Sequence, residues 1–351
     1  MSQPSKPRVA LLASAESSPS VLYGLFDVLW SVGAVYPDMV AGEPGDALLE
    51  VSIVAADREP FRCVGNVLVE PHAAIGTIDR IDAVVVCDMY TPIDKAPRGC
   101  YTREIEWLRR MHAKGSLIAS VCSGSLVLAE AGLLDGRPCT GHWAYRDLFR
   151  KHYPNVAFDD RSILNLESEP EGVITAGGVT AWQDLALYLI ARLCGPEHAL
   201  RTAKVHLLAG HEDGQGPFAA MGRRIQDDDA VISRCQAWIA QNYANANPVA
   251  GMTEQSGLPP RTFSRRFRSA TGYVPMDYVH ALRVEEAKQV IESTTSGIDE
   301  VGYLVGYEDP TFFRRLFKRE TGLTPAAYRR KFAGILAATT ASSGATLTAH
   351  G

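Results

Sequence analysis

The sequence predicts an α/β layer with a mostly parallel sheet, followed by a smaller all-α region. Two observations support this prediction. Short apolar, β-branched runs alternate with amphipathic segments of helical spacing through residues 8–195. A helix-turn-helix pattern then occurs twice within residues 230–332. A chain of 351 residues is also too long for one ordinary hydrophobic core, so we expect at least two domains.

Several runs in the first region have the composition of strands. The run IDAVVVC at residues 81–87 is continuous and β-branched, which is typical of a parallel strand covered on both faces. The other expected strands lie at residues 8–14, 48–55, 66–70, 116–121 and 172–175, with a short strand or turn at 140–143. Helices are expected at residues 21–33, 103–114, 125–131, 145–152 and 181–193.

Sites in such sheets form beyond the carboxyl ends of the strands. Three expected loops lie there, at residues 14–20, 88–92 and 120–125, and the turn at residues 176–178 joins them. We therefore expect Asp88, Cys122 and Gly177 to line one cleft.

Cys122 follows a buried strand and precedes a helix, which is the strand–turn–helix setting of a nucleophile elbow. The helix N-terminus would favour a thiolate there. His142, twenty residues further on, is a candidate base. A small buried cysteine that merely packs is an equal alternative from the local pattern.

The second region repeats one design at an offset of 50 residues. In the later copy, Asp309 suits the cap of a helix and Pro310 its first position. Phe313 and Phe317 lie on one side of this helix, and basic side chains lie largely on the other. Phenylalanines at 263 and 267 repeat this face, and both copies end in T-G-x-x-P. Because caps and turns recur together with charge, the pattern favours a helix docked in a DNA groove over a solvated basic surface.

The outer faces of the two repeated helices supply the candidate DNA contacts. In the first helix these are Arg261, Thr262, Ser264, Arg265 and Arg268. In the second they are Thr311, Phe312, Arg314, Arg315 and Lys318. Some should contact phosphate and others base edges. Arg266 is a weaker candidate, because it falls opposite Leu316 in the repeat and can pack along the core edge.

The remaining segments connect these parts. Residues 196–229 are expected to be a glycine-rich and acidic linker between the two domains. A helix at residues 230–243 should open the second domain, and one at 276–292 should join its two copies. The tail at residues 333–351 is rich in Ala, Thr, Ser and Gly and is expected to be disordered.

Charge separates the two regions. The formal net charge is −5, yet residues 231–332 carry 14 basic and 10 acidic side chains, so the remainder is strongly acidic. The basic part is the expected DNA binder. The seven cysteines form no C-x-x-C pair, and neither a signal peptide nor a membrane span is recognisable. These features predict a cytoplasmic protein with reduced thiols and no membrane partner, and we expect no metal and no cofactor.

The run GYEDPTFFRRLFKRETGLTPAAYRR is close to the signature of AraC/XylS-type transcription regulators. Residues 231–332 resemble the DNA-binding domain of that family. The resemblance implies two helix-turn-helix units, joined by a linker helix, that read successive major grooves of double-stranded promoter DNA. It also implies a homodimer, with RNA polymerase as a candidate partner.

The stretches ASVCSGSLVLAEAGLLDGRPCTGHW and TAGGVTAWQDLALYLI resemble the class I glutamine amidotransferase-like superfamily in its PfpI branch. The resemblance covers residues 8–195 and implies a doubly wound, flavodoxin-like sheet. It places Cys122 at the elbow with His142 and Trp143 near it. Asp184 matches an acidic residue common in regulators that join such a domain to an AraC-type reader.

Two departures from the PfpI pattern weigh against catalysis. The enzymes carry an early glutamate that hydrogen-bonds the cysteine, whereas Val21 stands there and Glu16 lies in the preceding loop. Asp88 begins a D-M-Y turn in place of the usual glycine-rich one, which removes a backbone donor for an oxyanion. Asp88 would suit a cationic ligand, with Tyr90, Trp143 and Trp182 as candidate aromatic walls. Core packing is the alternative for each aromatic.

These observations predict a sequence-specific transcription regulator whose first domain senses a small metabolite and lacks catalysis. Amines, quaternary ammonium compounds and amino-acid derivatives are the expected effectors. The expected binding residues are Asp88, Tyr90, Cys122, Ser123, His142, Trp143, Gly177 and Gly178. One alternative is an amidase or hydratase, with nucleophile Cys122 and base His142, fused to a DNA-binding domain. A first domain that only dimerises the reader is another.

Overall fold

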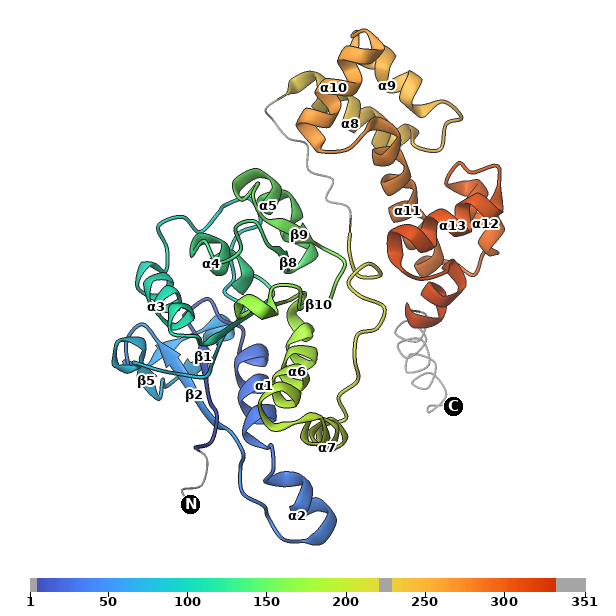
Figure 1. The fold of residues 1–351 in the computed structure, drawn as a ribbon. Coiled ribbons are helices and arrows are strands. Elements are labelled where there is room, and N and C mark those ends of the chain that lie inside the picture. The colour runs from blue at the N-terminus through green and yellow to red at the C-terminus, as the bar shows by residue number, and fades with distance from the viewer. Residues whose placement is uncertain (1–4, 221–228, 333–351) are drawn as a thin grey trace, which may run out of the picture. The chain divides into compact units, whose positions relative to one another are not determined.

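The computed structural model describes residues 5–220 and 229–332, and the chain divides into two compact units between Gln215 and Gly216 (Figure 1). The expected linker at residues 196–229 is therefore not a uniform connector. Its first part forms helix α7 (Pro196–His206), which packs on α6 (Trp182–Cys194) within the first unit. The expected disordered tail lies outside the described residues.

The first unit is a doubly wound sheet, as the sequence predicts. Its strand order is β10-β11-β7-β6-β1-β2-β5, and only β10 runs antiparallel to its neighbour. The bounds are β1 Arg8–Leu12, β2 Glu50–Ala55, β5 Ala73–Ala74, β6 Ala83–Val86, β7 Leu117–Val121, β10 Leu164–Asn165 and β11 Val173–Ala176. Two small ladders lie outside it, β3 (Phe61–Arg62) with β4 (Leu68–Val69) and β8 (Pro138–Thr140) with β9 (Ala157–Asp159).

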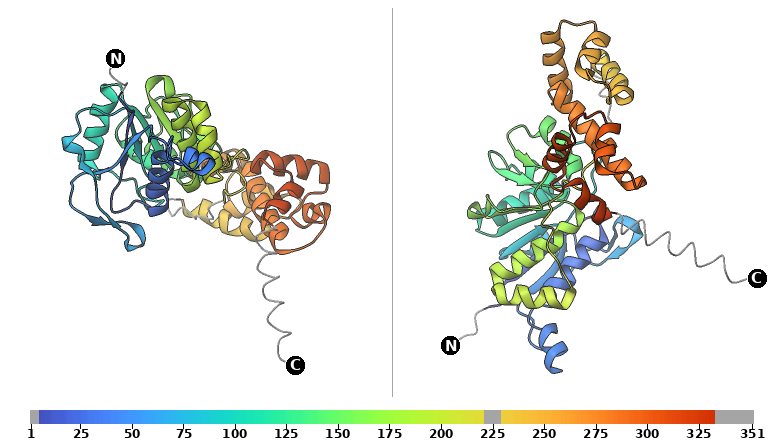
Figure 2. Two further views of the ribbon diagram at one scale, coloured as in Figure 1. Left: turned by 90° about the horizontal axis from the view of Figure 1, so that it is seen from below. Right: turned by 90° about the vertical axis from the view of Figure 1, so that its right-hand side faces the viewer.

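Helices cover both faces of this sheet. The helices α1 (Pro19–Trp30) and α6 lie side by side on one face (Figure 2). On the other face lie α3 (Thr102–Ala113), α4 (Gly124–Glu130) and α5 (Arg146–His152). Val9 and Leu11 of β1 pack toward the first face, and Ala10 and Leu12 toward the second, which is the period of two expected of a strand buried on both sides. A short helix, α2 (Val35–Ala41), packs on α7.

The second unit contains two helix-turn-helix copies on one long helix. The first copy comprises α8 (Ala230–Asn242), α9 (Pro248–Ser256) and α10 (Pro260–Thr271). The second comprises α12 (Ile298–Leu304) and α13 (Pro310–Thr321), and the helix α11 (Pro275–Ser293) runs between them. One end of α11 packs in the core of the first copy and the other end in the core of the second.

The offset of 50 residues seen in the sequence is reproduced in the packing. Phe267 and Phe317 are fully buried, and Tyr278 and Tyr328 meet them edge-on at ring-centroid distances of 5.2 and 5.4 Å. Thr271 Oγ1 donates to the backbone carbonyl of Phe267 at 2.7 Å, and the equivalent bond in the second copy is 2.8 Å. The two copies therefore have equivalent cores and equivalent helix ends, as well as similar charge.

Arg283 of α11 joins the two copies. Its Nε donates to the Tyr243 carbonyl at 2.7 Å and its Nη2 to the Asn245 carbonyl at 2.8 Å, so it holds the segment that follows α8. The same guanidinium lies 4.9 Å from the ring centre of Tyr307, at the turn of the second copy. Burial lowers the pKa of Arg283. One buried side chain thus holds both halves of the unit together.

Among the described residues, no single helix is long and apolar enough to cross a membrane, although α1 and α2 pass that test together as a pair bent by 61°.

Candidate functional site

Cys122 sits on the sharp turn between β7 and α4. Its φ of 56° places a residue other than glycine in the left-handed region, which is the strained backbone of an elbow. The turn is held because the Cys122 amide donates to the Ala176 carbonyl of β11 at 3.0 Å. Ser125 Oγ donates to the Cys122 carbonyl at 2.8 Å. The elbow geometry predicted from the sequence is present.

Burial of the thiol opposes the thiolate that the helix N-terminus would favour at this elbow. Burial, reinforced by the charge of Asp88, raises the pKa of Cys122 to about 12. Desolvation of the buried sulfur outweighs any benefit of the short helix α4 behind it.

Asp88 follows β6 and lies beside the elbow. Ser18 fastens this carboxyl group, since its backbone amide donates to Asp88 Oδ1 at 3.2 Å and its hydroxyl donates to Oδ2. Asp88 is only 4% exposed and pairs with no basic side chain among the described residues. Burial raises the pKa of the Asp88 carboxyl. The site therefore contains a buried acid without a counter-ion.

The hydrogen bonding of His142 does not suit the role of a general base. Its Nδ1 accepts the Ala144 amide at 3.1 Å, so the proton of the neutral ring is on Nε2. Burial lowers the pKa of the ring, which favours that neutral form. Within the part of the chain that the structure describes, no hydrogen bond joins His142 to Cys122. The alternative in which His142 serves as the base for Cys122 therefore has no such bond to support it among the described residues.

The other expected site residues fall into three groups. Tyr90 is 68% exposed, and Trp143 is half-buried with its ring 5.0 Å from that of His142. Ser123 is buried, and its hydroxyl accepts the Met89 amide at 3.0 Å, so it holds the β6 loop. Trp182 packs against Gly24 of α1 and on the core of that face, which agrees with the core-packing alternative given for it.

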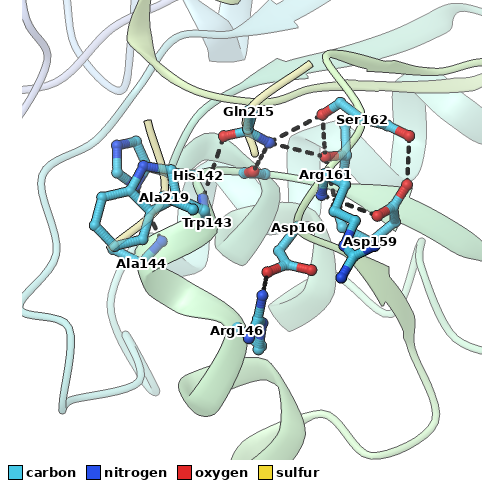
Figure 3. Close-up of polar contacts among 12 residues, drawn as sticks. His142, Trp143, Ala144, Arg146, Asp159, Asp160, Arg161, Ser162, Gln215 and Ala219 are labelled. Atoms are coloured by element: carbon cyan, nitrogen blue, oxygen red, sulfur yellow. Dashed lines mark hydrogen bonds and ion pairs between the residues drawn. The ribbon is translucent and has the colours of Figure 1, made fainter. Parts of the chain in front are cut away.

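Gly177 and Gly178 face a residue that the sequence did not suggest. A Cβ on Gly177 would lie 2.5 Å from Nε2 of Gln215, so only glycine fits beside that amide. Gln215 lies in the expected linker, and its side chain contacts both Gly177 and the backbone amide of Trp143. Figure 3 shows it beside Trp143. In the sequence, the glycines on both sides of Gln215 were the single local sign that this residue could be buried in the site. Ser18 and Tyr145, whose hydroxyl donates to the Thr91 carbonyl at 2.6 Å, were also missed.

The expected DNA contacts lie on the outer faces of α10 and α13. In α10, Arg261, Ser264, Arg265 and Arg268 are exposed and Thr262 is half-buried. Among the described residues, none of the three arginines pairs with an acidic side chain. Arg266 instead binds the carboxylate of Asp229 through Nε at 3.0 Å and Nη2 at 2.9 Å. Arg266, the weaker candidate, is thus engaged in an ion pair within the second unit.

In α13, Thr311, Arg314, Arg315 and Lys318 are exposed, but two expected contacts are engaged within the unit. Arg314 forms an ion pair with Asp299 of α12. Phe312 is half-buried against the rings of His280 and Tyr307, and Arg315 lies 5.6 Å above its ring. Phe312 thus supports Arg315 within the unit, and its expected contact with DNA stays a prediction.

Two protein-family models match the chain, a helix-turn-helix domain over residues 252–331 and the DJ-1/PfpI family over residues 20–192. The regulator CdhR of Pseudomonas aeruginosa is 28% identical over 323 residues, which is 87% of this chain and 88% of that protein. The regulator GlxA of Rhizobium meliloti is 28% identical over 64% of this chain and 68% of its own length. For GbdR of Pseudomonas aeruginosa the identity is 24%, over 87% and 82%. All three are named HTH-type transcriptional regulators.

Fold, repeat and comparisons agree on the class of protein: this chain is a DNA-binding transcription regulator. More particularly, it joins a DJ-1/PfpI domain to an AraC-type helix-turn-helix domain. Both resemblances drawn from the sequence are confirmed.

Proposed function

We propose that the first domain binds a small, cationic, nitrogen-containing metabolite and that binding changes how the second unit engages promoter DNA. Amines, quaternary ammonium compounds and amino-acid derivatives have the required charge. The effector site comprises the ends of β6, β7 and β11, with Asp88 as the charged contact. The domain acts in this role as a sensor and carries out no reaction.

The observation that carries this proposal is the buried Asp88 carboxyl without a counter-ion. Taking a carboxylate out of water is costly unless a positive charge accompanies it. A ligand ammonium group would supply that charge and would form a buried ion pair with the carboxylate. Tyr90 follows Asp88 by two positions, its amide donates to the Glu16 carbonyl at 2.8 Å, and its ring is exposed. An aromatic face attracts the same cation.

Three features support the absence of catalysis. Burial raises the pKa of the Cys122 thiol to about 12, so the thiol stays protonated at neutral pH. The Nδ1 lone pair of His142 is occupied by the Ala144 amide. The Met89 amide, which follows Asp88 in the loop after β6, already donates to Ser123 and is not free to bind an oxyanion. Nucleophile, base and oxyanion donor are therefore all compromised in the same site.

On the DNA side, we propose that α10 and α13 enter successive major grooves. Arg261, Arg265 and Arg268 supply the contacts of the first helix, and Arg315 and Lys318 those of the second. Their exposure on one face of each helix supports this assignment. We also propose that the regulator acts as a homodimer, which light scattering of the full chain at several concentrations would test.

Calorimetric titration of the full chain tests the effector proposal. The panel comprises primary amines, quaternary ammonium compounds and amino-acid derivatives, with neutral compounds of equal size as controls. We expect heat only from cations, and we expect Asp88→Asn to abolish it. Asp94→Asn provides the matched control, because Asp94 is an exposed acid in the same loop. Heat that survives in Asp88→Asn, or no heat from any cation, would contradict the proposal.

A further inference from the structure

Gln215 is a buried polar side chain whose amide is fully engaged in the first unit. It is 3% exposed. Its Nε2 donates to the carbonyls of Gly141 and Ser162, each at 2.9 Å, and its Oε1 accepts the Trp143 amide at 3.3 Å. Its own backbone amide donates to the Arg161 carbonyl at 2.8 Å. Figure 3 shows this amide at the centre of the network.

The residues just before Gln215 are also fastened to the first unit. His211 Nδ1 lies 2.6 Å from Asp184 Oδ2, and the His211 amide donates to Oδ1 at 3.1 Å. Thr180 Oγ1 lies 3.3 Å from His211 Nε2. Asp184, which the sequence singled out only by resemblance, thus anchors the start of the segment that ends at Gln215.

The residues just after Gln215 pack on the second helix-turn-helix copy. A Cβ on Gly216 would lie 2.7 Å from the Thr321 carbonyl, so the backbones are in close contact there. Phe218 meets Phe332 edge-on at 5.6 Å, and Lys331 Nζ lies 5.0 Å from the Phe218 ring centre. The buried Lys288 of α11 donates to the Ala219 carbonyl. These are all contacts within the second unit.

Residues 211–219, which we call the strap, are therefore bound to one unit up to Gln215 and to the other from Gly216. We propose that the strap couples the site of the first unit to the second helix-turn-helix copy, with Gln215 as its latch. Consecutive Cα atoms are held about 3.8 Å apart, so Gln215 cannot leave its pocket without disturbing Gly216. The packing of residues 216–219 should in turn stabilise the latch, because such coupling is reciprocal.

The position of Gln215 links this coupling to the proposed effector site. Gln215 lies against Gly177 and Trp143, which belong to the expected effector site. A ligand that occupies this part of the site competes with the glutamine amide for the Gly141 and Ser162 carbonyls. This last step rests on the proposed function, whereas the coupling itself does not.

Hydrogen exchange of the full chain, measured by mass spectrometry without ligand or DNA, tests the coupling. Gln215→Glu keeps the shape of the side chain but loses the two donors of Nε2, and Phe218→Ala removes a ring that is 48% exposed. In either variant we expect about tenfold faster exchange, both around residues 161–163 and 177 and around residues 321–323. Gln241→Ala, at an exposed position of α8, should change neither region.

Faster exchange confined to the unit that carries each substitution would overturn the proposal, as would a response to one variant only. Because the measurement needs no effector, it can succeed where the calorimetric panel fails, and the two proposals are separable.

Discussion

Arg283 offers the sharpest test of how the two reading helices are held together. Replacing it with methionine keeps a long apolar stem in α11 and removes the guanidinium. The Tyr243 and Asn245 carbonyls then lose their donors, and Tyr307 loses the cation on its ring. Because Arg283 is 4% exposed, water cannot easily replace these contacts.

The expected cost follows from the groups left behind. A hydrogen bond from a charged donor contributes about 1.5–3 kcal/mol, and the cation–π contact adds about 1 kcal/mol. The removed desolvation penalty of a buried charge offsets part of this sum. We therefore expect Arg283→Met to destabilise the second unit by about 3 kcal/mol. For a unit of this size, that is a fall in melting temperature of about 10–20 °C.

Calorimetric melting and DNA titration together measure the effect. Affinity for a site with both half-sites should fall much more than affinity for one half-site, since Arg283 fixes the spacing of the readers. Arg234→Met is the control, because Arg234 lies exposed on α8. Unchanged stability, together with unchanged dependence on half-site spacing, would refute the role assigned to Arg283.

Four further predictions follow. Replacing Arg265 or Arg315 with alanine should cost about 1–3 kcal/mol of operator binding free energy if the arginine reads a base. If it contacts phosphate, the slope of log affinity against log salt concentration should instead fall by about 1. Fluorescence anisotropy over a salt series distinguishes these outcomes, and no change in either variant would contradict the placement of α10 and α13 on DNA. Gly306→Ala should destabilise by at least about 1 kcal/mol in thermal melts, because φ is 91° and the new Cβ would lie 2.6 Å from the Ala244 carbonyl. Cys122 should resist iodoacetamide below about pH 8, and mass spectrometry that finds it labelled there would argue against a buried neutral thiol. Burial raises the folded-state pKa of Asp88, so the contribution of this group to stability is present below the unfolded pKa and is lost as pH rises through the folded pKa. The Asp88→Asn variant should therefore be more stable than the parent protein at neutral pH but not in acid. Melting curves recorded across that pH range check the sign.

The sequence predicted those features that depend on local pattern. The run IDAVVVC became the buried central strand β6, and the T-G-x-x-P endings marked the ends of α10 and α13. The apolar spacing in each repeat matched Phe263 and Phe313, both fully buried. Such signals lie within one turn or one strand, so tertiary packing has little opportunity to override them.

The features that escaped prediction depend on contacts between distant segments. Ser18 and Asp88 are 70 positions apart, and Gln215 meets Trp143 across 72. A glutamine in a glycine-rich stretch is usually solvated, and nothing local distinguishes one that is buried. Helix α7 was missed because its apolar face is weak: Thr202 is the one buried residue that the structure describes in it.

Hydroxyl-radical footprinting of promoter DNA by the full chain tests whether α10 and α13 read neighbouring grooves. We expect two sequence-selective protected patches on one face of the duplex, about 10 base pairs apart, with the patch of each helix weakened by its own arginine variant. A single patch, or protection that does not depend on sequence, would contradict the claim that α10 and α13 read neighbouring grooves.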